Sequence, residues 1–299
     1  MKKAVWLFEA GLFIVLSIPL AILPSGCSIK VGEMLGILLF HLWGSRRRVA
    51  LENLKNTVSN SAIKISEPAE KVIRDNFKNI GRSFIEIIKV YYGFGKKIIN
   101  SVGIEGAENF NHAKSKGRGV VFLTGHCGNW ELLAIVLSIR LSGIAVVARA
   151  INNPYINKLI ENTRQRYGNS VIYKRGALKP IIQTLKNNGV VGILMDQAVV
   201  PEEGYVIDFL GRGAWTTKMP ALISRKTGTA ALPVFIHRTG TGHKIIIHPA
   251  VELTDTNNKE KAVIEDTKRF SAFIEEYIQG HPSEWLWIHR RWKRVNSNQ

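Results

Sequence analysis

The segment GHCGNWE, at residues 125–131, places a histidine, His126, five residues before a carboxylate, Glu131. On a continuous helix five residues turn through about 500°, so the two side chains would lie on different faces. They meet only if His126 lies in a turn and Glu131 lies in the first turn of the next helix. A carboxylate that holds an imidazole lets it take a proton from an alcohol near neutral pH. The spacing therefore predicts a general base, His126, with Glu131 as its orienting acid.

The residues around this pair favour such a turn. Gly125 and Gly128 permit a tight backbone, and Asn129 is a favourable N-cap for a helix over residues 130–141. The apolar run at residues 119–124 is typical of the preceding strand. The alternative interpretation is a strand-to-helix turn whose histidine only caps or packs.

Other chemistries are disfavoured at this segment. The spacing differs from the His-Glu-x-x-His of helical zinc sites, and no Cys/His pair at ligand spacing lies nearby, so we expect no metal. Cys127 beside His126 is a candidate nucleophile, but adjacent residues in a turn usually point apart, so we expect a packed thiol. A hydrolase is unsupported because the sequence has no Gly-x-Ser-x-Gly nucleophile elbow.

Charge and the amino terminus indicate where the chain works. The 299 residues suffice for one large α/β domain, and a net charge of +18 would suit nucleic acid, a membrane surface or an acidic substrate. Residues 4–23 carry a single charge, Glu9, over a length that can cross a bilayer core. We expect an uncleaved anchor, with a cleaved signal peptide as the alternative. The excess of basic residues then indicates attraction to anionic lipid rather than to nucleic acid, since no helix-turn-helix, RNA-binding or zinc-finger signature is present.

The residues after this anchor support the same interpretation. A second apolar segment, residues 31–43, is short and contains Glu33 and His41, so we expect it to lie in the interface or to pack on the domain. Three arginines at residues 46–48 favour a cytoplasmic face for the rest of the chain. The two cysteines suggest no disulfide framework and fit a reducing compartment.

We divide the chain into a membrane anchor with an interfacial segment (residues 1–45) and a catalytic domain (46–299). Residues 46–100 have helical periodicity, and residues 101–299 alternate strands with helices before a basic aromatic tail. The predicted strands cover residues 119–124, 145–150, 171–174, 190–195, 231–237 and 244–251, the last as an antiparallel edge. The predicted helices cover residues 130–141, 154–167, 177–187, 217–227 and 259–277. This alternation predicts an α/β fold with a largely parallel central sheet flanked by helices, and functional residues beyond the carboxyl ends of the strands.

Several other residues fall near that edge. Asp196 and Gln197 follow a predicted strand, so they either line the same cleft or cap a turn. Arg149 and Arg164 lie near loops on the open side, where they form a solvated basic surface or, if they converge, a phosphate site.

Two apolar segments near the end of the chain each have two interpretations. Residues 209–217, FLGRGAWTT, either close over an acyl chain as a lid or pack on the core. The tail at residues 285–294, WLWIHRRWKR, suits a lipid headgroup boundary, with an RNA-stacking surface as the alternative.

Together these segments resemble the lipid A biosynthesis acyltransferases, the lauroyl/myristoyl-type branch of the lysophospholipid acyltransferase superfamily. The superfamily more often has aspartate at the acid position of the His-x4-acid motif, and Glu131 resembles this branch. The resemblance spans nearly the whole chain, through RRRVALENL, NFKNIGRSFIEIIK, GHCGNWELL, RAINNPYINKLIENTRQRYG, YKRGALK, MDQ, FLGRGAWTTKMPALISRKTG and PSEWLWIHRRWK.

The resemblance implies an enzyme on the cytoplasmic face of the bacterial inner membrane that needs no metal or other cofactor. It would move a fatty acyl group from acyl carrier protein, an acidic partner, to a hydroxyl of a glycolipid, foremost a lipid A precursor. His126 would be the base and Glu131 its orienting acid. Arg149, Arg164 and Asp196 match recurrent positions of the branch and are expected to bind substrate.

Some assignments stay open within this resemblance. Backbone amides of the turn from Gly125 to Asn129, or Arg149, are candidates to bind the oxyanion. The branch also includes enzymes that acylate mannosylated phosphoinositides. From charge alone, a non-catalytic membrane or nucleic-acid binding module is a further alternative.

Overall fold

The structure is a computed structural model that describes residues 2–240, 242–293 and 295. Its strands are β1 (Val102–Glu105), β2 (Val120–Thr124), β3 (Ile144–Ala148), β4 (Ser170–Tyr173), β5 (Val190–Leu194), β6 (Gly204–Phe209), β7 (Arg212–Thr217), β8 (Ala230–Thr239) and β9 (Gly242–Ile247). Its helices are α1 (Lys2–Ile22), α2 (Ser25–Leu42), α3 (Gly44–Ser59), α4 (Ala69–Tyr91), α5 (Lys96–Asn100), α6 (Ala107–Ser115), α7 (Trp130–Arg140), α8 (Pro154–Arg166), α9 (Leu178–Lys186), α10 (Met219–Thr227) and α11 (Lys259–Gly280).

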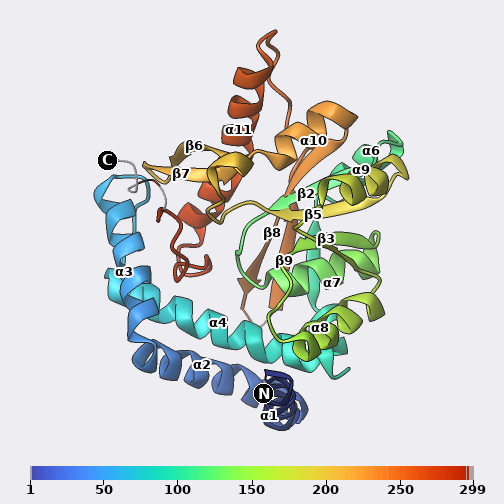
Figure 1. Ribbon diagram of the computed structural model, residues 1–299. Helices are drawn as coiled ribbons and strands as arrows, with labels where there is room; N and C mark the ends of the chain where they lie inside the picture. Colours follow the sequence, from blue (N-terminus) through green and yellow to red (C-terminus); the bar gives the residue numbers. More distant parts are fainter. Residues whose placement is uncertain (1, 241, 294, 296–299) are drawn as a thin grey trace.

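Seven of these strands form one sheet in the order β1-β9-β8-β2-β5-β3-β4 (Figure 1). The neighbours from β8 through β2, β5 and β3 to β4 run parallel. Strand β9 is antiparallel to β8 and parallel to β1. The expected α/β fold with a largely parallel central sheet flanked by helices is therefore confirmed.

The sheet is covered on both faces because its middle strand, β2, divides its side chains between two apolar cores. Val121 and Leu123 belong to the core that includes residues of α9, α10 and α11. Val120 and Phe122 belong to the core that includes residues of α6 and α7. A strand that is buried on both faces appears in the sequence as an unbroken apolar run, as residues 119–124 do.

The elements expected after residue 101 are present, with ends shifted by a few residues. Strands β1, β6 and β7 and helix α6 were not predicted. Strand β9 is antiparallel to β8, as expected, but it is not an edge strand, because β1 pairs with its other side.

The FLGRG segment forms the turn of the hairpin β6–β7 and not a lid. Leu210 and Gly211 have φ values of 54° and 75°. Positive φ at both central positions is typical of a type I′ hairpin turn. The side chains of Phe209 and Leu210 are buried, so the structure supports the packing alternative.

Helix α2 runs alongside α4, which separates it from the α/β core, and α1 contacts α4 at a steep angle (Figure 1). Helix α1 is long and apolar enough to cross a membrane, and α2 with α3 passes the same test only as a pair bent by 92°. Much of the surface of α1 is apolar and exposed, at Val5, Leu7, Phe8, Leu12, Val15 and Leu16.

Helix α2 packs on the domain through glycines, as one of the two alternatives for residues 31–43 has it, while Met34, Leu38 and Leu42 of the same helix are exposed. A Cβ on Gly36 would lie 2.2 Å from the carbonyl oxygen of Phe77. A Cβ on Gly81 of α4 would lie 2.0 Å from the carbonyl oxygen of Gly32. Only glycine at these positions lets the two helix backbones approach so closely.

The tryptophan-rich tail is part of the core, so its assignment to a lipid headgroup boundary is wrong. Trp285, Trp287 and Trp292 are 1%, 0% and 4% exposed. The tail is held beside the His126 turn, because Leu286 N–H donates to the His126 carbonyl at 3.0 Å. Arg294, which belonged to the same prediction, lies outside the described residues.

Candidate active site

The turn after β2 forms as the residue types predict. The side-chain oxygen of Asn129 accepts a hydrogen bond from Leu132 N–H at 3.2 Å, so Asn129 is the N-cap of α7. Gly128 has a φ of +55°, and a Cβ there would lie 2.1 Å from the carbonyl oxygen of Ile236. Both the backbone conformation and the close approach therefore require glycine at position 128.

His126 is paired with Asp196, the residue that follows strand β5 by two positions. Its Nδ1 lies 2.8 Å from Asp196 Oδ1, and its backbone N–H donates to Asp196 Oδ2 at 3.0 Å. The register of the sheet explains this meeting, because Thr124 of β2 pairs with Leu194 of β5. Two residues beyond each strand, position 126 lies opposite position 196.

Asp196 is an ionised carboxylate inside the protein. It is 2% exposed and also accepts a hydrogen bond from Trp285 Nε1 at 2.8 Å. Burial alone raises its pKa, but the charge and hydrogen bonds of His126, with the bond from Trp285, outweigh burial and hold the pKa well below its usual range. A carboxylate against Nδ1 favours the tautomer with its proton on Nδ1, which leaves the lone pair on Nε2. The side-chain Nε2 of Gln197 lies 3.2 Å from His126 Nε2 and is placed to donate to that lone pair.

The predicted pairing of His126 with Glu131 is wrong. Glu131 accepts hydrogen bonds from Arg164 Nε at 2.7 Å, from Arg164 Nη2 at 2.8 Å and from the hydroxyl of Tyr91 at 3.2 Å. Within the described part of the chain, no hydrogen bond joins Glu131 to His126. As the second residue of α7, Glu131 faces α8 and α4, whereas the His126 ring lies over the end of β5.

The ion pair of Glu131 and Arg164 is largely shielded from solvent, with side-chain exposures of 16% and 21%. Burial alone lowers the pKa of the Arg164 guanidinium, but the hydrogen bonds and charge of Glu131 outweigh burial and raise it. The bidentate geometry fixes both groups on the wall of the cleft.

Two cavities meet at this wall. One, of about 380 Å³, is lined by His126, Gln197 and Lys174 among others. The other, of about 390 Å³, is mostly apolar and is enclosed by α1, α4 and α8. Its apolar lining includes Phe13, Ile80, Phe84, Ile87, Ile156 and Ile160. Both cavities share Trp130, Glu131, Ala148, Arg149 and Arg164.

Arg149 and Arg164, for which the sequence left a solvated surface and a converging site open, both line the place where the two cavities meet. Arg149 directly follows β3 and is exposed. Asp196 lies beneath His126 and lines neither cavity, so its position fits a partner of the imidazole better than a substrate contact. Gly125 packs against Asp196, since a Cβ on it would lie 3.3 Å from the Asp196 Cβ.

Two further observations concern the cysteine and the metal ligands considered above. Cys127 is 1% exposed, and burial raises the pKa of its thiol well above the usual value, so it is a packed side chain. Among the described residues, no group of three or more His, Cys, Asp and Glu side chains is placed to hold a metal ion.

Reasoning from the sequence missed Trp285 and Tyr91, which hold Asp196 and Glu131 from far along the chain. Trp285 gave a misleading signal, because tryptophans among arginines are typical of a membrane boundary. Tyr91 gave none, because it lies near the end of a helix with ordinary amphipathic periodicity.

Comparison with known proteins identifies the family of this chain. The family model described as bacterial lipid A biosynthesis acyltransferase matches residues 2–294. A lipid A biosynthesis palmitoleoyltransferase of Escherichia coli (strain K12) is 26% identical over 269 residues, which are 88% of this chain and 84% of that protein. A lipid A biosynthesis lauroyltransferase of the same strain is 23% identical over 291 residues, 96% of this chain and 90% of that protein.

A phosphatidylinositol mannoside acyltransferase of Mycolicibacterium smegmatis is 25% identical over 186 residues, 60% of this chain and 59% of that protein. The family model, in contrast, extends from α1 through the buried tryptophans of the tail. The chain therefore belongs to the bacterial lipid A biosynthesis acyltransferase family.

Proposed function

We propose that this protein transfers a fatty acyl group from acyl carrier protein to a hydroxyl of a membrane glycolipid, foremost a lipid A precursor. The observation that carries the proposal is the buried, ionised Asp196 bonded to Nδ1 of His126, a histidine that lines a cleft. This arrangement suits an imidazole that accepts a proton at Nε2. Family membership supplies the reaction class.

The reaction would proceed in one attack and one collapse. His126 Nε2 takes the proton of the acceptor hydroxyl while that oxygen attacks the thioester carbonyl. Asp196 stabilises the imidazolium that forms. The tetrahedral intermediate then expels the thiolate of the donor, which takes the proton back from the imidazolium, and the ester leaves.

We favour Arg149 over the backbone amides of the turn for binding the oxyanion. Two of the five N–H groups from Gly125 to Asn129, those of His126 and Gly128, are already bonded, to Asp196 and to the Glu284 carbonyl at 2.8 Å. The guanidinium of Arg149 is exposed where the two cavities meet, and no hydrogen bond to another described residue occupies it. A donor at that junction suits a carbonyl oxygen that becomes negative.

The mostly apolar cavity would hold the acyl chain. A cavity of about 390 Å³ lined by isoleucines and phenylalanines suits an alkyl chain, and its polar mouth at Glu131 and Arg164 lies where the thioester would face His126. Glu131 would act by holding Arg164 and the mouth of this cavity, and not by orienting the base.

We further propose that the enzyme works at the cytoplasmic side of the bacterial inner membrane, with residues 1–45 as anchor and 46–299 as the catalytic domain. The exposed apolar face of α1 supports attachment to the bilayer. The net charge of +18 would favour both anionic lipid and an acidic carrier protein. A phosphoinositide mannoside is a second candidate acceptor, because one relative is named for that activity.

The test is mass spectrometry of lipids extracted from cells with and without this protein. We expect one glycolipid to lose one acyl chain, whose mass names both the acceptor and the donor length. The matched variant is His126→Ala, which should reproduce the loss, because removing a general base lowers kcat by at least about 100-fold. An unchanged lipid profile, or full acyl transfer by folded His126→Ala, would refute the proposal.

A further inference from the structure

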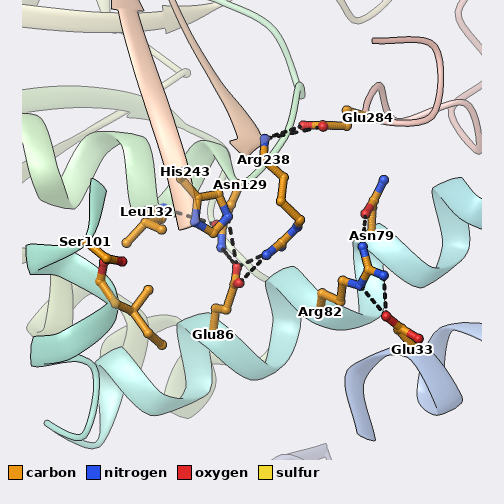
Figure 2. A network of polar contacts seen from close by, with 11 residues as sticks. Glu33, Asn79, Arg82, Glu86, Ser101, Asn129, Leu132, Arg238, His243 and Glu284 are labelled. Carbon is orange, nitrogen blue, oxygen red and sulfur yellow. Dashed lines mark hydrogen bonds and ion pairs between the residues drawn. The ribbon is translucent and has the colours of Figure 1, made fainter. Parts of the chain in front are cut away.

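We propose that Glu86 of α4 is a positioning residue of the active site that acts through Asn129. This inference rests on the proposed function, because it concerns how the His126 turn is held for that reaction. Glu86 lines neither of the two cavities at His126 but a separate one of about 320 Å³, and it lies 43 residues from Asn129 along the chain. Figure 2 shows its carboxylate at the centre of a buried polar network.

The Glu86 carboxylate has four polar contacts from three side chains. Asn129 Nδ2 donates to Oε2 at 2.9 Å, and Arg238 donates through Nη1 to Oε1 at 2.6 Å and through Nη2 to Oε2 at 3.1 Å. His243 Nε2 lies 3.3 Å from Oε2. Burial alone raises the pKa of Glu86, but the contacts with His243 and Arg238 outweigh burial and lower it to about 2. The carboxylate is therefore ionised at neutral pH.

This charge determines which way the Asn129 amide faces. An ionised carboxylate can only accept hydrogen bonds, so Nδ2 must face Glu86 and Oδ1 must face α7. There Oδ1 accepts from Leu132 N–H and fixes the first turn of the helix. That turn carries Trp130, whose ring centre lies 5.1 Å from the His126 ring, and Glu131, which holds Arg164.

A second connection runs from Glu86 to the same turn. Arg238, held by Glu86, donates its backbone N–H to the Glu284 carboxylate at 3.3 Å (Figure 2). The Glu284 carbonyl accepts the N–H of Gly128 at 2.8 Å. One carboxylate thus supports both Gly128 and Asn129, two of the three residues between His126 and α7.

The test exchanges the carboxylate of Glu86 and the amide of Asn129. Asn129→Asp keeps a good N-cap but places a second carboxylate against Glu86. Glu86→Gln supplies an amide, so the double variant E86Q/N129D restores one carboxylate and one amide with their positions reversed. We expect N129D to lower kcat at least about tenfold and the double variant to recover to within about threefold of wild type. Glu33→Gln is the control. Glu33 lies on α2 and pairs with Arg82, which lies one turn before Glu86 on α4, so this variant removes a neighbouring ion pair and should leave kcat unchanged.

A readout independent of catalysis accompanies the kinetics. Hydrogen exchange at Leu132 N–H should be faster in N129D than in wild type and should return toward the wild-type rate in the double variant. A purely structural role would change the unfolding temperature without this reversal. The full-length protein is used throughout, and its unfolding temperature is measured for every variant.

Each outcome decides the inference. A folded N129D with wild-type kcat overturns it, as does a folded double variant no faster than N129D. If N129D alone does not fold, the double variant must be faster than E86Q, and a slower or equal rate overturns the inference. If the wild type transfers no acyl group, the proposed function fails, and the exchange rates at Leu132 still decide this inference.

Discussion

At the scale of single residues, the identity of the acid beside His126 determines how the base works. Asp196 is buried, ionised and bonded to both Nδ1 and the backbone N–H of His126. Glu131, which the local spacing favoured, binds Arg164 at the mouth of the apolar cavity. The two carboxylates therefore have different tasks, and variants of each should give different kinetic signatures.

We expect Asp196→Asn to lower kcat by about 10²- to 10⁴-fold with little change in KM. An amide at this position can donate to Nδ1, which favours the tautomer that cannot accept a proton at Nε2. The measurement is steady-state acyl transfer by the purified, folded variant. Cys127→Ala is the control, and as a neighbouring buried thiol it should keep most activity. A wild-type kcat in Asp196→Asn would show that Asp196 does not orient the His126 imidazole and would favour Glu131 for that role.

We expect Glu131→Ala to lower kcat/KM at least about tenfold, because it leaves Arg164 without its carboxylate. A cycle with Arg164→Ala separates two mechanisms. If Glu131 acts by holding Arg164, the double variant is hardly worse than either single one. Additive losses of catalytic rate would instead indicate that Glu131 acts on its own at the reacting groups.

At the scale of elements, α4 is the support on which the other segments are assembled. One face of this helix carries the polar residues Asn76, Asn79, Arg82, Glu86 and Lys89. Asn76 binds the carbonyls of Ser283 and Trp285, Arg82 binds Glu33 of α2, and Lys89 binds the carbonyl of Ala21 at the end of α1. Together with Glu86, this face joins the amino terminus, the tail and the active-site turn.

The contribution of Glu86 to stability should depend on pH. Its pKa falls from an ordinary 4.5 to about 2 in the folded protein. A lowered pKa means that the stabilisation is complete above about pH 4.5 and is lost as the pH falls toward 2. We expect Glu86→Gln to reduce the free energy of unfolding by on the order of 3 kcal/mol at pH 7 and by clearly less at pH 3.5.

Denaturant unfolding in detergent at the two pH values measures this difference. Glu265→Gln is a suitable control, because Glu265 pairs only with exposed Lys268 in the described structure and should matter little at either pH. An equal deficit for Glu86→Gln at both pH values would contradict the linkage.

The contact of α2 with α4 should be intolerant of a single methyl group. Gly36→Ala places its Cβ against the Phe77 backbone, so we expect it to lower the free energy of unfolding by about 1–3 kcal/mol. Gly26→Ala on the same helix meets nothing within 4 Å and should be neutral or slightly stabilising. The comparison of the two variants by thermal unfolding removes the effect of helix propensity, and equal stability would show that the helices can separate freely.

At the scale of the whole molecule, the amino-terminal helix is both a membrane candidate and a wall of the substrate cavity. Phe13 lines the apolar cavity, and the single charge within residues 4–23, Glu9, accepts a hydrogen bond from Asn153 at 2.9 Å. Asn153 also donates to the carbonyl of Trp6 at 2.8 Å. These contacts hold α1 against the start of α8.

Deletion of residues 1–24 should therefore have two effects. We expect the protein to move partly from the membrane pellet to the soluble fraction, because the exposed apolar face of α1 is removed. We also expect a weaker preference for acyl chain length, because the cavity loses the Phe13 wall. Fractionation and lipid mass spectrometry measure the two effects, and a variant wholly in the pellet would show that other surfaces attach the protein.

Local patterns in the sequence were enough to predict much of this molecule. The alternation of apolar runs and amphipathic stretches predicted the α/β fold, and GHCGNWE predicted a turn with His126 before an Asn129-capped helix. Such features depend on neighbouring residues, whose backbone preferences are set within a few positions.

The tertiary structure alone decided which side chains meet across long separations. Asp196 reaches His126 because β5 lies beside β2 in register, and the residues of neither strand determine the order of strands in the sheet. The same applies to Glu86 beneath Asn129 and to Trp285 against Asp196, which are 43 and 89 residues apart. Tertiary packing also decided that the tail is buried. Tryptophans among arginines suit either a membrane boundary or a protein core, and segments from elsewhere in the chain cover them here.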